Sequence, residues 1–172
     1  AVALGAEAVL VGTIGDDAAG DRVRGLIDAT PRLESAVVVE TERVTTTKTR
    51  YFGGAHQLLR VDREGGTEPG EDASRALAAA VEAASARAGA IVVSDYAKGV
   101  SGDARTAALI ASARAAGRPV IVDPKSAEFA RYRGATVLTP NAAELAAATG
   151  MATAGDEAVE DAARAVLDIT GA

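Results

Sequence analysis

Short apolar runs alternate along this chain with longer stretches of helical character. Apolar, often β-branched runs predict strands that are buried on both faces at 8–11, 90–93, 120–122 and 135–138. Apolar residues at helical spacing, or runs of alanine, predict helices around Val23–Ile27 and over 73–88, 101–116, 141–148 and 156–168. Crossovers of about a dozen residues between strands require parallel pairing. The pattern therefore predicts an α/β fold with a doubly wound, mostly parallel sheet.

Residues 36–62 have a different pattern, because short runs replace the helix-sized crossovers. The run Val37–Val39 is followed by the alternating run Thr45–Phe52, by the turn Gly53-Gly54 and by a second run, Gln57–Asp62. We interpret the whole stretch as antiparallel β-structure. The domain is therefore expected to carry a small β-sheet insertion at about 36–62, which we interpret as a lid or an interface.

Alternation along this insertion gathers polar groups on particular faces. Lys48 and Arg50 fall on one face of the first strand, whereas Gln57, Leu59 and Val61 share a face of the next. Cations and amides on one face of a small inserted sheet indicate a lid or an interface rather than more core. The pattern alone explains Lys48 and Arg50 equally well as solvated residues on an exposed edge.

Composition narrows the chemistry available to the chain. It has no cysteine and a single histidine, which excludes disulfides, thiolate metal sites and the usual zinc clusters. A net charge of -6 argues against nonspecific binding to nucleic acid or an anionic membrane. No apolar run approaches the roughly 20 residues of a membrane span, and the start lacks the basic residues of a signal peptide. We therefore expect a cytoplasmic protein, without nucleic acid or membrane partners, that works through carboxylates, Lys and Arg.

Both ends of the chain are abrupt. It does not begin with Met, and Ala1–Ala6 is typical of a helix end that runs into a strand. The last helical pattern stops at Ile169–Ala172, where an α/β chain would begin its next strand. We expect residues 1–172 to form a partial domain of a longer protein.

The first predicted strand is followed by a glycine-rich turn, Gly12–Gly20. Its glycines allow a tight connection into a helix, and Asp16 or Asp17 can cap that helix. A phosphate-binding loop is the other interpretation. It is disfavoured because the turn lacks a Gly-Lys-Ser/Thr ending and because acidic residues at the helix start would repel phosphate.

Three later strands end in polar, turn-forming segments. These segments are Ser94–Gly99, Asp123–Lys125 and Thr139–Glu144. Because the carboxyl ends of parallel strands meet at one edge of a sheet, their polar side chains can share a ligand. The residues concerned are Asp95, Lys98, Asp123, Lys125, Asn141 and Glu144.

The pair Asn141 and Glu144 has two interpretations. Asn followed three residues later by Glu at a helix start can form a capping box. The same pair can order water around a metal–phosphate complex, because Mg²⁺ keeps most of its waters. The pattern alone favours the cap. Similarly, Lys125 can steady phosphate charge, and Asp123 can orient that lysine or a metal-bound water, although Asp-Pro also ends strands simply as a turn.

Taken together, these segments resemble the ribokinase-like carbohydrate kinases of the phosphofructokinase B type. The matching segments, in order, are Gly12–Gly20, Thr45–Arg50 with Gln57–Asp62, Ser94–Gly99, Asp123–Lys125 and Thr139–Glu144. The resemblance covers essentially the whole chain. Ser-Asp-Tyr-x-Lys-Gly combined with Asp-Pro-Lys most closely resembles those members that phosphorylate D-glycero-β-D-manno-heptose 7-phosphate.

The resemblance implies ATP- and Mg²⁺-dependent phosphorylation of a sugar phosphate, here heptose 7-phosphate to heptose 1,7-bisphosphate. It implies that the ATP phosphates lie at Asn141, Ala142, Ala143, Glu144, Lys125 and Asp123, with Glu144 holding Mg²⁺ through water. It implies that the sugar phosphate is bound by Asp95, Lys98, Lys48, Arg50, Gln57 and Arg60. Lids of this family often build dimer interfaces, so a homodimer through the β-insertion is expected.

Two motifs of the family do not occur in these 172 residues. They are the Gly-Gly motif that grips the sugar and the Gly-Ala-Gly-Asp motif that carries the catalytic Asp. The resemblance therefore implies that no catalytic residue lies in this chain, and that the fragment alone has little or no kinase activity.

Other functions remain open from the sequence. One is a ribokinase-like kinase that acts on a fructose phosphate or a free sugar. Another is a dehydrogenase-type Rossmann domain, although Gly12–Gly20 does not fit Gly-x-Gly-x-x-Gly. A third is a non-catalytic module for nucleotide binding or dimerisation.

Overall fold

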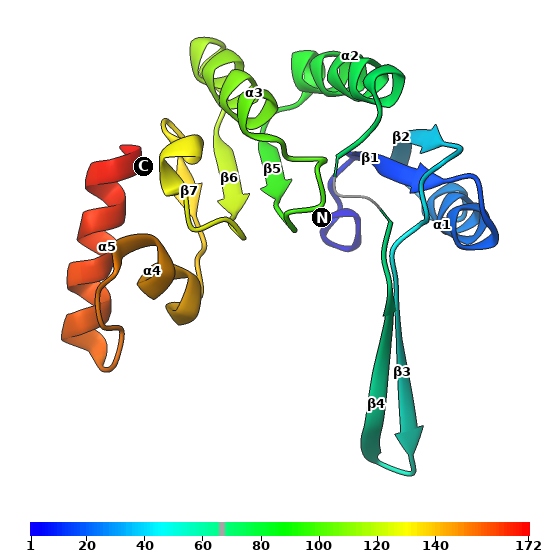
Figure 1. The fold of residues 1–172 in the computed structure, drawn as a ribbon. Coiled ribbons are helices and arrows are strands. Elements are labelled where there is room, and N and C mark those ends of the chain that lie inside the picture. Colours follow the sequence, from blue (N-terminus) through cyan, green and yellow to red (C-terminus); the bar gives the residue numbers. More distant parts are fainter. Residues whose placement is uncertain (66–67) are drawn as a thin grey trace. The chain divides into compact units, whose positions relative to one another are not determined.

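The computed structural model describes residues 1–65 and 68–172, which form two compact units, Ala1–Ala84 and Ser85–Ala172 (Figure 1). The elements that begin in the first unit are η1 (Val2–Leu4), β1 (Ala8–Gly15), α1 (Ala18–Asp28), β2 (Leu33–Glu40), β3 (Thr47–Gly53), β4 (His56–Arg63) and α2 (Glu71–Arg87). Those of the second are β5 (Ile91–Ser94), α3 (Asp103–Ala115), β6 (Val120–Asp123), η2 (Phe129–Tyr132), β7 (Val137–Leu138), α4 (Ala142–Thr149) and α5 (Asp156–Thr170).

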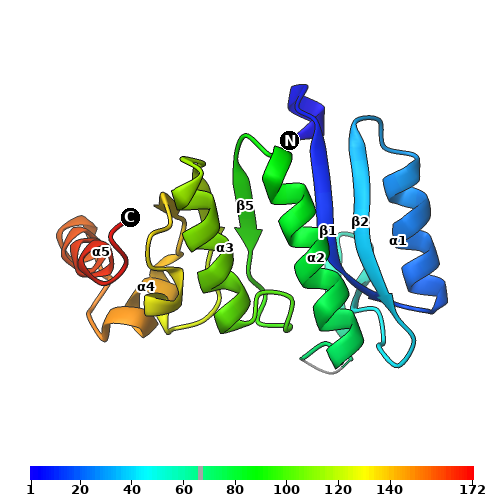
Figure 2. The same cartoon turned by 90° about the horizontal axis from the view of Figure 1, so that it is seen from above.

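In the first unit, β1 and β2 pair in parallel, and α1 connects them and lies beside β2 (Figure 2). The expectation that all of 36–62 is antiparallel is therefore wrong for its first part, because Val37–Val39 belong to β2. Three consecutive apolar residues are typical of a strand covered on both faces, and a helical crossover makes the next strand parallel.

The antiparallel structure is the hairpin β3–β4, which reverses at Gly54 with a φ of 61°. A register shift separates the pairs Tyr51–Leu59 and Phe52–Gln57. Cross-strand partners share a face, and a slip of one residue moves a side chain to the other face. The prediction that Gln57 shares a face with Leu59 is therefore wrong. The irregularity places Gln57 with Phe52, on the face of Lys48.

The second unit contains a parallel sheet in the order β5-β6-β7. Each of these strands is a short apolar run, and helical segments follow them along the chain. The parallel pairing confirms the predicted α/β arrangement. β7 is shorter than the predicted strand. Thr136, just before β7, bonds β6 in a different way, because its N–H donates to the carbonyl of Val120 at 2.8 Å and its Oγ1 accepts from Val120 N–H at 2.9 Å.

The core of the second unit lies on one face of this sheet. It is formed by Val93, Ile110, Ala113, Val120, Val122, Phe129, Tyr132, Ala135, Leu145, Ala162 and Val166. On the opposite face, Val92, Ile121 and Val137 form a row across the three strands. Val92 is 72% exposed and Val137 44% exposed, so this apolar row is largely uncovered.

None of the helices in the described part of the chain is long and apolar enough to cross a membrane.

Candidate functional site

The carboxyl ends of β5, β6 and β7 lie at one edge of the second unit's sheet. Asp95 N–H donates to the carbonyl of Asp123 at 2.9 Å, and Thr139 N–H donates to the carbonyl of Val122 at 3.0 Å. These bonds hold the three strand ends in register. The structure therefore brings the polar segments after these strands to the same edge, as parallel pairing requires.

At this edge, α4 begins with a complete capping box. Asn141 Oδ1 accepts from Glu144 N–H at 3.0 Å, and Glu144 Oε2 accepts from Asn141 N–H at 3.0 Å. The capping-box interpretation is thus confirmed. The same carboxylate also reaches beyond its own helix, because Lys125 Nζ lies 3.2 Å from Glu144 Oε1. One carboxylate therefore both caps α4 and pairs with Lys125.

The surroundings of Glu144 favour its charged form. The pKa of Glu144 lies below its usual value. The hydrogen bond from Asn141 N–H is the larger cause, and the ammonium group of Lys125 adds to it. A carboxylate has about four acceptor positions, and the contacts above use two of them. Glu144 therefore retains capacity to accept from water. Ala142 and Ala143 are exposed beside it and contribute first-turn N–H groups, which have no partner inside a helix.

The two residues that flank Pro124 have different partners. Thr139 Oγ1 donates to Asp123 Oδ1 at 3.3 Å, whereas Lys125 Nζ pairs with Glu144. The sequence suggested Asp123 as the group that orients Lys125. In the structure Lys125 pairs with Glu144, whereas Asp123 is held by Thr139, the first residue after β7.

Asp95 is deeply buried rather than displayed at the edge. Only 4% of the residue is exposed. Its Oδ2 accepts from Tyr132 Oη at 2.6 Å, and its Oδ1 accepts from Ala97 N–H at 2.8 Å. Both oxygens therefore have partners within the protein. Asp95 holds the start of the loop that carries Lys98, itself half-buried.

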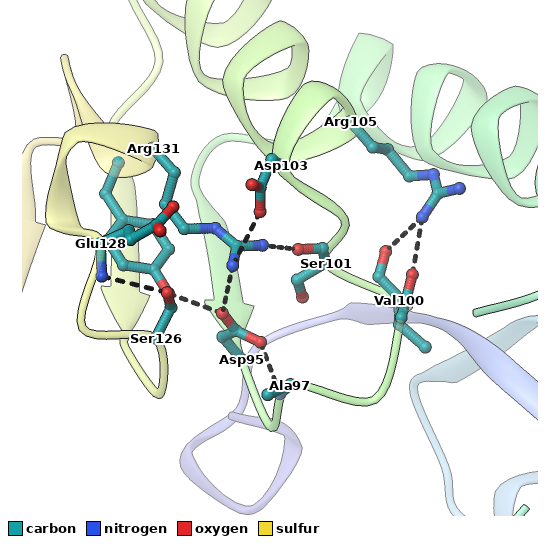
Figure 3. A network of polar contacts seen from close by, with 11 residues as sticks. Asp95, Ala97, Val100, Ser101, Asp103, Arg105, Ser126, Glu128 and Arg131 are labelled. Carbon is teal, nitrogen blue, oxygen red and sulfur yellow. Dashed lines mark hydrogen bonds and ion pairs between the residues drawn. The ribbon is translucent and has the colours of Figure 1, made fainter. Parts of the chain in front are cut away.

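Arg131 reaches from η2 toward Asp95 and the start of α3 (Figure 3). Its Nη1 lies 2.9 Å from Asp103 Oδ1 and 3.9 Å from Asp95 Oδ2, and its Nη2 donates to the carbonyl of Ser101. The guanidinium also stacks 5.4 Å from the centre of the Tyr132 ring. The buried Nε of Arg131 has no hydrogen-bond partner among the described residues.

The Asp95–Tyr132–Arg131 network was missed by sequence reasoning. Phe129 and Tyr132 form an edge-to-face pair with centroids 5.7 Å apart, inside a short 3-10 turn. The available signal was the pair of aromatic residues itself, in a chain that is only 3% aromatic. The pKa of Tyr132 is raised to about 12, mainly by burial and secondly by the hydrogen bond to Asp95. The phenol is therefore a hydrogen-bond donor at neutral pH.

The predicted sugar-phosphate residues of the first unit lie on the hairpin. Register places Lys48, Arg50, Gln57 and Arg60 on one face together with Asp62. Lys48 Nζ lies 2.9 Å from Asp62 Oδ2 and Arg60 Nε lies 2.8 Å from Asp62 Oδ1. These bonds raise the pKa of Lys48 and lower that of Asp62. Lys48 and Arg60 are thus paired with Asp62, and Lys48 Nζ also lies 3.2 Å from Glu64 Oε1.

The opposite face of the hairpin is apolar and open. Register places Thr49, Tyr51, Leu59 and Val61 on it. Leu59 is 49% exposed and Val61 50% exposed. The two faces of the hairpin therefore differ in chemistry, with one charged and the other apolar.

A metal ion with three or more protein ligands from His, Cys, Asp or Glu does not fit the described residues. In the residues that the structure describes, no group of three or more His, Cys, Asp or Glu side chains could hold one. Mg²⁺ commonly binds through one or two carboxylates and several waters. A single carboxylate with spare acceptor positions, such as Glu144, fits a Mg²⁺ ion that keeps most of its waters.

Sequence comparison places the chain among known proteins. The sequence profile of the pfkB family of carbohydrate kinases matches residues 1–171. A bifunctional protein HldE of Caulobacter sp. is 53% identical over 165 residues, which is 96% of this chain and 33% of that protein. The HldE protein of Paramagnetospirillum magneticum is 45% identical over 170 residues, 99% of this chain and 35% of its own length. The chain thus spans about a third of these relatives.

Solved structures show the same fold. Escherichia coli phosphofructokinase-2 in complex with fructose-6-phosphate has a TM-score of 0.74 at 21% identity, covering 98% of this chain and 55% of that one. Arabidopsis thaliana ribokinase complexed with ribose and ATP has a TM-score of 0.62 at 19% identity, with coverage of 94% and 52%.

Proposed function

The chain belongs to the pfkB family of carbohydrate kinases, and we propose that it forms the phosphate-binding part of an ATP-dependent heptose 7-phosphate kinase. The observation that carries this proposal is the contact between Lys125 and Glu144 at the N-terminus of α4. It combines a cation, a carboxylate and free helix N–H groups at the carboxyl edge of a parallel sheet. ATP use fits the cytoplasmic location expected from the sequence.

Phosphoryl transfer needs positioning and charge neutralisation more than covalent chemistry. We assign phosphate contacts to Lys125 and to the N–H groups of Ala142 and Ala143, next to Asn141. Glu144 would hold water on Mg²⁺, and when bound the ion would neutralise phosphate charge. Asp123 would shape the same edge through its bond to Thr139. The base that accepts the hydroxyl proton is expected from a Gly-Ala-Gly-Asp motif outside these residues.

The sugar-phosphate side of the proposal rests on the hairpin and on the loop after β5. Lys48, Arg50 and Arg60, with Gln57 beside them, present cations suited to a phosphorylated sugar. Lys98 would contact the sugar directly. Asp95, whose oxygens are engaged by Tyr132 and Ala97, would act by fixing that loop. A closed lid would also exclude water that competes for the phosphoryl group.

The heptose is the most specific part of the proposal. It is supported by the combination of Ser94–Gly99 with Asp123–Lys125 and by the similarity to HldE proteins. The alternative within the family is another sugar phosphate, such as a fructose phosphate.

A direct test is turnover of candidate substrates with ATP and Mg²⁺. We expect the complete protein to release ADP with heptose 7-phosphate at a kcat/KM at least tenfold higher than with fructose 6-phosphate or an unphosphorylated heptose. We expect residues 1–172 alone to give no turnover. Stabilisation by NAD and not by ATP–Mg²⁺ in a thermal-shift assay would exclude the kinase, and turnover by residues 1–172 alone would refute the missing-base assignment.

We further propose that the apolar face of the hairpin pairs two copies of the protein. An isolated two-stranded hairpin is marginal in water, so exposed Leu59 and Val61 are suited to packing against a second copy. Leu59→Glu is expected to weaken the dimer at least tenfold, because it introduces a charge into an apolar contact worth about 1.5–3 kcal/mol. Light scattering after gel filtration measures the mass. Gln57→Glu, on the charged face, should leave the dimer intact, and a stable dimer in both variants would contradict this interface.

A further inference from the structure

We propose that Asp17 is a positioning residue that clamps the root of the β3–β4 hairpin through Thr45. The consequence for sugar phosphate binding rests on the proposed function, whereas the clamp itself rests on contacts within the first unit. The glycine-rich turn Gly12–Gly20 then serves the hairpin and not a phosphate.

The two oxygens of Asp17 connect different segments. Oδ1 accepts from Gly20 N–H at 2.8 Å and caps α1, which confirms the predicted cap. Oδ2 accepts from Thr45 N–H at 3.0 Å, two residues before β3 begins. One carboxylate therefore ties the start of a helix to the start of the hairpin.

Thr45 strengthens this connection from its own side. It is buried, and its Oγ1 accepts from Gly15 N–H, the last residue of β1, at 2.8 Å. Thr45 thus donates to the helix cap and accepts from the strand end. The segment that leads into the hairpin is held at both points.

The glycines of the turn are required by this close packing. A Cβ on Gly15 would lie 2.0 Å from the carbonyl oxygen of Arg43, and a Cβ on Gly20 would lie 2.2 Å from that of Gly15. A Cβ on Gly65, just after β4, would lie 2.9 Å from Val44 N. The segments that enter and leave the hairpin therefore run close to each other, and the entering segment runs against the β1–α1 turn.

A second connection joins the hairpin root to the end of β2. Glu40 Oε2 lies 2.7 Å from Arg43 Nε, and both side chains are largely buried. Glu40 Oε1 accepts from Gly70 N–H at 2.6 Å. Residues before and after the hairpin are thus anchored to the same strand end.

The root determines where the hairpin points, because the strands themselves are exposed along their length. The eight residues of β4 extend roughly 27 Å at about 3.4 Å per residue, so a tilt of about 10° at the root moves the tip by roughly 5 Å. Such a displacement would separate the cationic face from a bound sugar phosphate. The clamp is present throughout the physiological range, since the N–H groups of Gly20 and Thr45 lower the pKa of Asp17 to about 2.

Asp17→Asn tests the clamp with little risk to the fold. Asn caps helices as well as Asp does, so its oxygen can still accept from Gly20. Its amide NH₂ would then face the N–H of Thr45, and two donors cannot bond. Asp16→Asn is the matched control, because it removes the same charge at the neighbouring exposed position.

Two measurements on the complete protein separate the possible results. In Asp17→Asn, amide hydrogen exchange at Thr45 and at the root pair Thr47 and Arg63 should become at least tenfold faster, with β1 and β2 unchanged. The KM for the sugar phosphate should rise at least fivefold and the KM for ATP should not change. Asp16→Asn should match the wild type in both measurements.

Other results have distinct meanings. Unchanged exchange at the hairpin root, or faster exchange spread evenly over the first unit, would overturn the clamp. Faster exchange at the root with an unchanged KM for every sugar phosphate would support the clamp and would instead refute the hairpin as a substrate lid.

Discussion

Glu144→Gln is expected to lower kcat/KM for ATP-dependent phosphorylation by about 10- to 100-fold while the fold stays intact, the usual loss when a group that orients metal-bound water is changed. Gln also completes a capping box, so its side chain can still accept from Asn141 N–H. The substitution removes only the negative charge that pairs with Lys125 and would hold water on Mg²⁺. Steady-state kinetics over a range of Mg²⁺ concentrations measure the effect.

The dependence on Mg²⁺ distinguishes this role from a structural one. In Glu144→Gln, the Mg²⁺ concentration at half-maximal rate should rise, with the free energy of unfolding within about 1 kcal/mol of the wild type, the range for losing one ion pair with an exposed lysine. Glu157→Gln is a suitable control because Glu157 is also an acid in the first turn of a helix, α5, and is itself exposed. Equal losses of activity in both variants, or full activity in Glu144→Gln, would remove Glu144 from the phosphate site.

The edge that carries this site could be predicted because it depends on local pattern and on one topological rule. Apolar runs that end in Asp123-Pro124 and in Thr139-Pro140 identify strand ends, and parallel pairing brings such ends together. The cap at Asn141 is equally local, since it needs only two residues three positions apart. The roles of Asn141 and Glu144 toward a phosphate remain predictions.

The parts that could not be predicted depend on contacts between distant residues. The antiparallel assignment of Val37–Val39 was wrong because a short apolar run does not indicate which strand it pairs with. Here the partner is β1. Gln57 was placed on the wrong face because the irregularity after Tyr51 has no clear signal in the alternation. The bond from Tyr132 to Asp95 could not be predicted, because the position of Asp95 in the sequence does not reveal a Tyr hydroxyl from 37 residues away.

The same distant contact leads to the second large effect. Tyr132→Phe is expected to lower the free energy of unfolding by about 2 kcal/mol, the range for losing a hydrogen bond to a charged group. The ring and its edge-to-face contact with Phe129 would remain, so the loss isolates the hydroxyl. Asp95 Oδ2 would keep only the guanidinium of Arg131 at 3.9 Å. Urea denaturation at pH 7 measures the difference, and Tyr96→Phe, at a Tyr that is 65% exposed, is the control.

The pH dependence of this difference identifies its cause. Because the pKa of Tyr132 is raised to about 12 in the folded protein and is about 10 in an unfolded chain, its stabilising effect is complete below about pH 10 and is lost as pH rises toward 12. The stability of the wild type should therefore fall toward that of Tyr132→Phe over this interval, while Tyr96→Phe follows the wild type. A constant difference up to pH 12 would mean that the Tyr132 hydroxyl stabilises the protein by some means other than its bond to the Asp95 carboxylate.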